Sequence, residues 1–311
     1  MSKINLVFFG TPDFAVPSLD ILHNHPHVNL EYVISMPDRK SGRGMDISSP
    51  EVIEYAKKNK LPFFQTENIN KETEFLNELE KKNIDGFIVL AFAQFLGEKL
   101  LNLPNLGCFN IHTSLLPKYR GAAPIQYALL NGDKSTGVSI QRMVKKMDAG
   151  DVCLSHPVDI SSSETGGQLY TRLKYQAALS LDTFVHKLFS SELTFKKQDE
   201  ALVSIAPTLK REDGFLDFKS SNFKEIDNKV RGLFPWPGTY CFLNSKRLKV
   251  FSIAKDPQSI PPGTHSVETG ALLIGCLNAT IRIKELQLEG KKRSSDIELL
   301  NGLKKDFVIN P

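Results

Sequence analysis

Short apolar strands alternate with helix-like segments along the first 189 residues of the chain. The segments 86–92 (GFIVLAF) and 107–112 (GCFNIH) are nearly continuous in apolar residues, as in strands buried on both faces of a parallel sheet. Further strands are predicted at 4–9 and 30–35, and helices at 14–22, 50–58 and 71–81. The alternation predicts an α/β domain with a doubly wound, mostly parallel sheet. Because such sheets bind ligands beyond the carboxyl ends of their strands, we expect a site after Phe9, after Leu90 or around 110–116.

The pattern changes in the last third of the chain. Short alternating runs broken by Gly, Pro and Asn predict a small antiparallel β domain, a barrel or a sandwich. These runs are 239–243, 246–254, 270–276 and 279–288. A long helical segment at 164–189 is expected to close the first domain. We therefore predict a first domain over 1–189, a polar linker over 190–206 and a β domain over 207–311.

Composition excludes several other classes of protein. The chain is 41% hydrophobic and 24% charged, which is ordinary for a globular protein. No segment approaches the roughly 18 to 20 apolar residues of a membrane-spanning helix. The start, MSKINLVFFGTPDF, lacks the architecture of a signal peptide. We expect a cytoplasmic protein that has no membrane partner.

The cysteines are widely separated. Cys108, Cys153, Cys241 and Cys276 form no C-x-x-C pair, so the spacing indicates neither a zinc site nor a disulfide framework. We expect reduced thiols and no metal.

Positive charge is concentrated near the C-terminus. The chain has 39 Lys and Arg against 35 Asp and Glu, and residues 208–311 hold 17 of the former against 12 of the latter. This asymmetry is consistent with a polyanionic partner such as nucleic acid and also with a well-solvated surface.

The segment 110–124, NIHTSLLPKYRGAAP, contains the strongest chemical signal. Asn110 and His112 stand two residues apart at a strand end, so their side chains leave the same face of the sheet. An amide that can donate to an oxyanion and an imidazole that can carry a proton would then share one space. If the segment stood alone, a hydrogen-bonded histidine at a strand terminus would be the favoured explanation.

A second polar segment, MDAGD, places Asp148 and Asp151 around Gly150. A carboxylate beside a histidine stabilises the imidazolium, so one of these residues is a candidate partner for His112. Turn chemistry alone also favours such a loop. Spacing leaves open whether the two loops meet.

Together, NIHTSLLPKYRGAAP and MDAGD resemble the folate-dependent formyltransferase family, whose signature is N-x-H-x-S-L-L-P and D-x-G-D. The resemblance implies a formyltransferase-like α/β catalytic domain followed by a small OB-like β-barrel. It implies that Asn110, His112 and Asp148 are catalytic, and that the co-substrate is 10-formyltetrahydrofolate, used without a metal. The residues implied to seat the folate are Ser114, Leu115, Leu116 and Pro117.

Nearly the whole chain is similar to the family members that act on charged initiator tRNA. The further matches are FFGTPDFAVPSL, MPDRKSGRG, ALVSIAPTLKREDGFLDF and RGLFPWPGTY. The implied reaction transfers the formyl group to the α-amino group of methionyl-initiator tRNA for bacterial translation initiation. We expect a monomer.

Two basic regions are candidate tRNA contacts. The loop Met36 to Pro50 carries Arg39 and Arg43, and Arg43 matches the family's key arginine. Where family members commonly have further lysines, this chain has Met45-Asp46-Ile47. In the β domain the candidates are Lys246, Arg247, Lys249, Lys291, Lys292 and Arg293. Trp236, within PWPG, is expected to pack into a turn rather than to stack on a base.

Two alternatives remain open. One is another folate-dependent formyltransferase, or a formyltetrahydrofolate hydrolase, acting on a nucleotide, an amino sugar or water. The other is an RNA-binding module on a catalytically inactive sheet, which the presence of Asn110, His112 and Asp148 disfavours.

Overall fold

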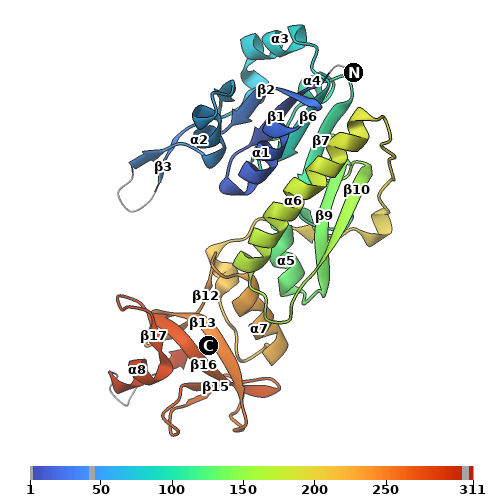
Figure 1. The fold of residues 1–311 in the computed structure, drawn as a ribbon. Helices are drawn as coiled ribbons and strands as arrows, with labels where there is room; N and C mark the ends of the chain where they lie inside the picture. Colours follow the sequence, from blue (N-terminus) through green and yellow to red (C-terminus); the bar gives the residue numbers. More distant parts are fainter. Residues whose placement is uncertain (1–2, 42–45, 303–307, 311) are drawn as a thin grey trace. The chain divides into compact units, whose positions relative to one another are not determined.

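The chain forms two compact units (Figure 1). The computed structural model describes residues 3–41, 46–302 and 308–310. The first unit comprises Met1–Gly121, Thr136–Asp159 and Tyr170–Ile205, and the second comprises Ala122–Ser135, Ile160–Leu169 and Ala206–Pro311. Each unit is built around its own sheet.

The sheet of the first unit is mostly parallel. Its strands, in spatial order, are β10 (Val152–Asp159), β9 (Ser135–Arg142), β7 (Gly107–His112), β6 (Gly86–Leu90), β1 (Ile4–Gly10), β2 (Val28–Ser35) and β5 (Phe63–Gln65). The strands from β7 to β5 pair in parallel, whereas β9 runs antiparallel to β7. The predicted fold class is confirmed, with β1 in the middle of the five parallel strands, as doubly wound topology requires.

Helices cover both faces of this sheet. They are α1 (Val16–Asn24), α2 (Glu51–Lys58), α3 (Thr73–Lys81), α4 (Glu98–Leu101) and α6 (Gly166–Phe189), with 3₁₀ turns at Asp13–Ala15, Ile69–Lys71 and Glu200–Leu202. Phe9 and Phe87 pack in one core cluster with Phe75 of α3. Phe8 and Ile88, which alternate with them and so face the other side, are also fully buried. Figure 1 shows α1 and α6 along one face.

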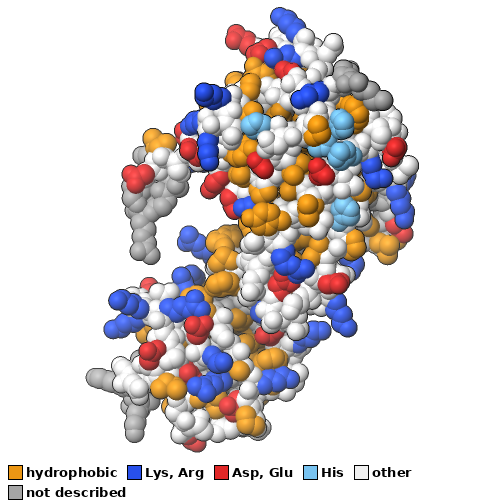
Figure 2. Space-filling model, viewed as in Figure 1, with side chains coloured by type: hydrophobic (Ala, Val, Ile, Leu, Met, Phe, Trp, Pro, Cys, Tyr) orange, Lys and Arg blue, Asp and Glu red, His pale blue; other side chains and the backbone are white. Residues whose placement is uncertain are grey.

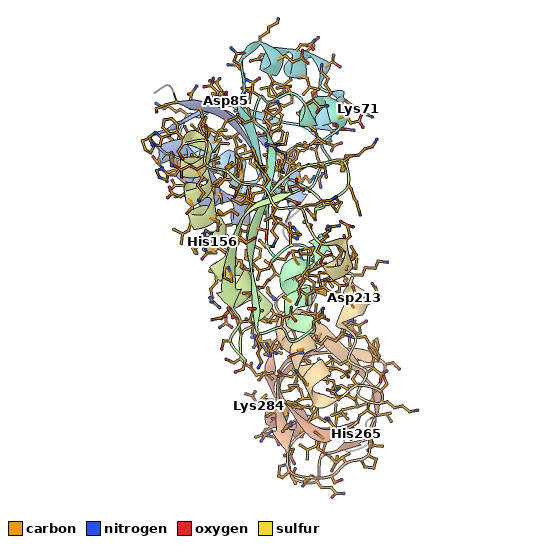
Figure 3. The ribbon with its side chains drawn as sticks, turned by 90° about the vertical axis from the view of Figure 1, so that its right-hand side faces the viewer. Lys71, Asp85, His156, Asp213, His265 and Lys284 are labelled. Carbon is orange, nitrogen blue, oxygen red and sulfur yellow. The ribbon has the colours of Figure 1, made fainter. Side chains whose placement is uncertain are left out.

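Helix α6 is tied to the β10 side of the sheet by a polar contact. His156, labelled on β10 in Figure 3, has its Nδ1 2.7 Å from Oγ of the buried Ser180 on α6.

Short strands complete the connections: β3 (Arg39–Ser41) pairs antiparallel with β4 (Asp46–Ser48), and β8 (Arg120–Gly121) and β11 (Ile205–Ala206) are two residues each.

The second unit contains an antiparallel sheet, as predicted. Its strand path is β14 (His265–Ser266), β15 (Leu273–Cys276), β16 (Ala279–Leu288), β13 (Lys246–Asp256), β12 (Thr239–Leu243) and β18 (Ile309–Asn310), with β17 (Ser294–Ser295) beside β16. Its helices are α5 (Pro124–Leu130), α7 (Phe223–Gly232) and α8 (Asp296–Asn301), with a 3₁₀ turn at Arg211–Gly214. Leu248 and Val250 alternate into its core. Asn228 of α7 donates from Nδ2 to the carbonyl of Leu130 at the end of α5.

The cysteines are free, as expected. Cys108, Cys241 and Cys276 are buried, and Cys153 is partly buried. Burial raises the pKa of the Cys108 and Cys241 thiols to about 12, which keeps them protonated and unreactive near neutral pH.

The expectation for Trp236 is wrong, because its side chain is 53% exposed. The backbone N–H of Gly238 closes the turn by donating to the carbonyl of Leu233, whose side chain is fully buried beside Ala123 and Leu209. Among the described residues, no helix is both long enough and apolar enough to cross a membrane.

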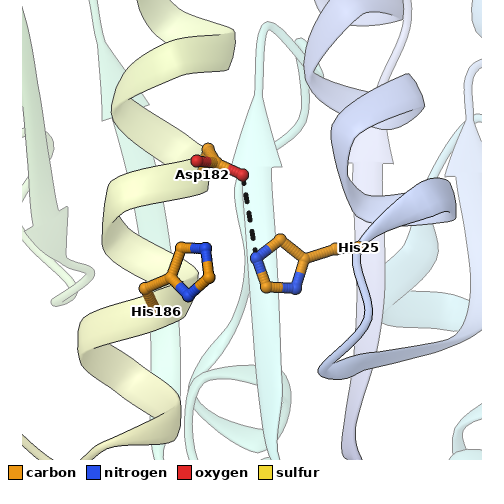
Figure 4. A group of neighbouring side chains, drawn as sticks. All are labelled: His25, Asp182 and His186. Carbon is orange, nitrogen blue, oxygen red and sulfur yellow. Dashed lines mark ion pairs between the residues drawn. The ribbon is translucent and has the colours of Figure 1, made fainter.

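A histidine cluster lies between the end of α1 and the C-terminal part of α6. Figure 4 shows the rings of His25 and His186 and the carboxylate of Asp182 facing one another. The buried His25 places Nε2 3.7 Å from Asp182, beyond hydrogen-bond distance, so that nitrogen has no hydrogen-bond partner. Because His25 Nδ1 accepts the backbone N–H of His27, the neutral ring carries its proton on Nε2. A metal ion at Nε2 would have to displace that proton, and this tautomer therefore disfavours metal binding.

Stability should depend on pH through His25. Burial lowers the pKa of His25 below its usual 6.5, and His186 and His27 lower it further although Asp182 opposes them. The unfolded chain therefore takes up a proton near pH 6.5 that the folded chain resists, and stability falls as the pH drops below that value. We expect His25→Phe to reduce the difference between the free energies of unfolding at pH 7.5 and pH 5.5, measured by urea denaturation. Equal pH dependence in both proteins would contradict this account.

Candidate active site

Two predicted residues lie at the carboxyl end of β7. Asn110 and His112 are on the same face of the strand, at the edge of the sheet where ligands bind in this class of fold. The antiparallel neighbour β9 places Gln141 opposite Asn110 and Ser139 opposite His112. Two amide side chains therefore stand side by side at this edge.

The structure brings Asp148 to this point, although it lies 38 residues beyond Asn110. Oδ1 of Asp148 accepts from Nδ2 of Asn110 at 3.3 Å and from Nε2 of Gln141 at 2.9 Å. Oδ2 accepts the backbone N–H of Gly121 at 2.8 Å and lies 3.7 Å from Nδ1 of His112. The three predicted catalytic residues thus form one cluster around a single carboxylate.

The backbone of the MDAGD loop is held tightly. Asp148 has a φ of +50°, in the left-handed region that Asp tolerates better than most residues. A Cβ at Gly150 would lie 1.6 Å from the carbonyl oxygen of Arg142, so the chain approaches β9 too closely for any side chain there. Asp151, the second carboxylate of the motif, bonds through its backbone carbonyl to the N–H of Arg142. Only Asp148 presents its carboxylate to His112.

Hydrogen bonding fixes the tautomer of His112. Its ring is buried, and Nε2 lies 2.8 Å from the backbone carbonyl of Tyr119, which can only accept. Nε2 therefore carries a proton, and Nδ1 is the nitrogen that can gain or lose one. Because Nδ1 faces Asp148, a proton on it would lie beside a carboxylate.

The predicted folate-seating segment is a tight turn after β7. The hydroxyl of Ser114 is fully buried and donates to the carbonyl of Lys118 at 2.6 Å, so it holds the turn. Leu115, Leu116 and Pro117 are partly exposed, and the Leu116–Pro117 peptide bond is cis. Ser139 fixes the turn from β9, since its Oγ donates to the Ser114 carbonyl and accepts from the Leu116 N–H. A ligand at this turn would meet Leu115 to Pro117 rather than the Ser114 hydroxyl.

Four buried polar residues at the site were not predicted from sequence: Arg120, Ser139, Gln141 and Gln198. Arg120 donates from Nε and Nη2 to Oε1 of Gln198, and from Nη2 to Glu200 at 2.7 Å. Arg120, with Lys146 beyond it, lowers the pKa of the Glu200 carboxyl to about 2. Strand β9 did carry a signal, because polar Ser139 and Gln141 alternate with apolar residues in STGVSIQR.

The first candidate tRNA region is a two-stranded ribbon. Arg39 is exposed on β3, whose backbone pairs with β4 at Arg39↔Ser48. Arg43 lies outside the described residues, and so does Met45. Ile47, the last residue of the Met45-Asp46-Ile47 stretch, is 72% exposed.

The second candidate region is on the antiparallel sheet. Lys246 and Lys249 are exposed, and the guanidinium of Arg247 lies 3.9 Å from the centre of the Tyr240 ring. A groove of about 420 Å³ runs along this surface, lined by Phe242, Arg247, Lys249, Gln287, Leu288, Glu289 and Gly290. The exposed Lys291, Lys292 and Arg293 follow directly on Gly290. Figure 2 shows Lys and Arg side chains spread over this unit with Asp and Glu between them, and Arg293 pairs with Glu285 at 2.6 Å.

Comparison with known proteins matches both parts of the chain. Residues 2–182 match the formyl transferase family, and residues 208–304 match the formyl transferase C-terminal domain. A protein of Geobacter metallireducens named methionyl-tRNA formyltransferase is 38% identical over 303 residues, which are 97% of this chain and 96% of that protein. Another of that name, from Thermotoga neapolitana, is 41% identical over 301 residues, or 96% and 95% of the two chains. The resemblance inferred from the motifs is confirmed.

Solved structures share the fold at lower identity. The N-formyltransferase of Helicobacter canadensis, in complex with folinic acid and dTDP-3-aminofucose, has a TM-score of 0.66 and 20% identity, over 91% of this chain and 99% of that one. HypX of Aquifex aeolicus, in complex with tetrahydrofolic acid, has a TM-score of 0.62 and 14% identity, over 98% of this chain and 49% of that one.

Proposed function

Because the chain belongs to the formyl transferase family, we propose that it transfers the formyl group of 10-formyltetrahydrofolate to the α-amino group of methionyl-initiator tRNA. The product, formyl-methionyl-tRNA, is the one with which bacterial translation begins. The relatives named for this activity align with nearly the whole chain, including its C-terminal part. We place the protein in the cytoplasm as a monomer, with folate as a co-substrate and without a metal.

The observation that carries the proposal is the cluster of Asn110, His112 and Asp148. Attack of an amine on the formyl carbon builds a tetrahedral centre with an oxyanion, so the site needs a hydrogen-bond donor and a proton carrier. Asn110 uses one amide hydrogen on Asp148, and we assign the other to the oxyanion. His112 exchanges a proton at Nδ1, and Asp148 stabilises the ring when it is charged. The substrate amine is itself the nucleophile, so the protein needs none.

The competing substrate class is an amino sugar. The test offers the enzyme equal concentrations of methionyl-initiator tRNA and a dTDP-linked amino sugar, together with 10-formyltetrahydrofolate, and measures the two products by mass spectrometry. We expect formyl-methionyl-tRNA to dominate. Preferential formylation of the sugar would replace the tRNA proposal, and release of free formate without either product would point to a hydrolase.

We propose that tRNA contacts both basic regions, through Arg39, Arg43, Lys246, Arg247 and Lys249 as well as the cluster 291–293. Lys291, Lys292 and Arg293 are expected to contact phosphates, so replacing all three with alanine should raise KM for tRNA and leave kcat nearly unchanged. The negative slope of the log binding constant against log salt concentration should become shallower by roughly one unit per lost contact. Arg293 should contribute least, because Glu285 already pairs with it.

The matched control for this prediction changes charge elsewhere. Lys71→Ala combined with Lys81→Ala removes two exposed charges at and near α3. This control should keep the wild-type salt slope. An unaltered slope in the triple variant would show that its three residues do not touch the tRNA backbone.

A further inference from the structure

Gln198 is a buried glutamine in the polar segment between α6 and β11. Only 7% of its surface is exposed, although the residues on either side, Lys197 and Asp199, are exposed. Its amide nitrogen lies 2.8 Å from the backbone oxygen of Asp148 and 2.7 Å from that of Gly150. Both carbonyls belong to the loop that carries the Asp148 carboxylate.

The orientation of this amide is forced by its neighbours. Arg120 offers only donors, and two of its nitrogens lie 3.0 and 2.8 Å from Oε1 of Gln198. The carbonyls of Asp148 and Gly150 can only accept, so they take the two hydrogens of Nε2. The Oε1 atom of Gln141 is a longer third neighbour, at 3.2 Å. A neutral side chain with an acceptor on one side and two donors on the other fits this position.

Gln198 also contacts Gln141, one of the residues that hold the carboxylate. Gln141 donates to Oδ1 of Asp148, and Gln198 lies against the oxygen of the same Gln141 amide. The backbone at Asp148 is in the left-handed region, which persists only when its surroundings hold it. Two short bonds from one buried amide supply such a constraint.

We propose that Gln198 is a positioning residue, which holds the Asp148 loop so that the carboxylate faces Nδ1 of His112. The inference rests on the proposed function of that cluster. Gln198 acts only through Asp148, and Arg120 acts through Gln198 by fixing the orientation of its side-chain amide. Loss of the two bonds lets the loop shift, and a displacement of about 1 Å at a catalytic group can cost about 100-fold in rate.

Two variants and one control test this inference. Gln198→Leu removes the bonds, and Gln198→Glu keeps the shape and the acceptor for Arg120 but turns an oxygen toward the two carbonyls. The control Glu200→Gln alters the other partner of Arg120 at the surface and leaves Gln198 in place. For each variant, circular dichroism checks folding, and transfer to charged tRNA is measured across pH. The same assays are made on Asp148→Asn and on Asp148→Asn combined with Gln198→Leu.

We expect both Gln198 variants to lose about 10- to 100-fold in kcat with KM for folate little changed, whereas Glu200→Gln stays within about twofold of wild type. Their pH profile should approach that of Asp148→Asn, and the double variant should be little worse than Asp148→Asn alone. A purely structural role would lower stability without these two effects. Wild-type kcat in either folded Gln198 variant, or additive losses with an unchanged pH profile, would overturn the inference.

Hydrogen exchange separates this inference from the proposed function. In the Gln198 variants the amides of 146–151 should exchange faster than in Glu200→Gln, with or without substrates. Failure of the proposed function shows instead in the wild-type enzyme, which would form no formyl-methionyl product. Equal exchange in this loop in all variants would contradict the positioning role whatever the substrate.

Discussion

Replacing His112 with alanine is expected to lower kcat for formyl transfer by about 100-fold or more, and replacing Asn110 with alanine should do the same. His112 holds the exchangeable proton at Nδ1, and Asn110 has an amide hydrogen free of Asp148 for the oxyanion. Both side chains are polar and lie at the carboxyl end of β7, and neither belongs to the apolar cluster around Phe9 and Phe87, so the fold should survive. Single-turnover rates with charged initiator tRNA, alongside circular dichroism, measure the effect.

Ser114→Ala is the matched control for these two variants. It removes a hydroxyl from the same turn, but that hydroxyl is fully buried and donates to the carbonyl of Lys118. We expect a loss of stability of about 1 kcal/mol and a much smaller loss of rate. A folded His112→Ala enzyme with near-normal turnover would remove this histidine from the mechanism.

Gly150→Ala is expected to disrupt both stability and activity. The added Cβ would lie 1.6 Å from the Arg142 oxygen and 2.9 Å from its carbonyl carbon. Both atoms are backbone, so no side chain can move aside, and the loop itself must shift. We expect a loss of about 3 kcal/mol in the free energy of unfolding and about 100-fold in kcat, because Asp148 moves with the loop. Urea denaturation and transfer assays measure the two effects.

Gly302→Ala is the corresponding control, since its Cβ would meet only ordinary contacts, the nearest at 3.6 Å. Its stability should stay within about 0.5 kcal/mol of wild type. If Gly150→Ala behaved in the same way, the close approach of the loop to β9 would not be a constraint on the site.

The parallel half of the first sheet could be predicted because its signal is local. Strands such as β6 are apolar throughout and are buried on both faces, so the run of apolar residues is enough to predict a buried strand. Helix α1 was predicted two residues too early, since residues 13–15 form a 3₁₀ turn before it. The first and last residues of a helix depend on such turns, which the pattern of hydrophobic residues does not indicate.

The meeting of Asp148 with His112 could not be predicted from spacing. It depends on β9, which runs antiparallel to β7. The alternating pattern of β9 indicates that Ser139 and Gln141 face solvent, whereas both are buried in the structure. Family resemblance pointed to Asp148, but the antiparallel pairing is what places Gln141 beside Asn110. The burial of Gln198 could not be predicted from the sequence, because the segment around it is polar. Its partners, Arg120 and the two carbonyls, are far from it in the chain.

The central claim is that this cluster transfers a formyl group to charged initiator tRNA. The most direct test is a single-turnover reaction of excess enzyme with 10-formyltetrahydrofolate and methionyl-initiator tRNA, in which formyl-methionine released from the tRNA is measured by mass spectrometry. The account predicts that product from the wild-type enzyme, and its loss when Asn110 or His112 is replaced by alanine. Binding of the folate without any formyl-methionine from the wild-type enzyme would contradict the account.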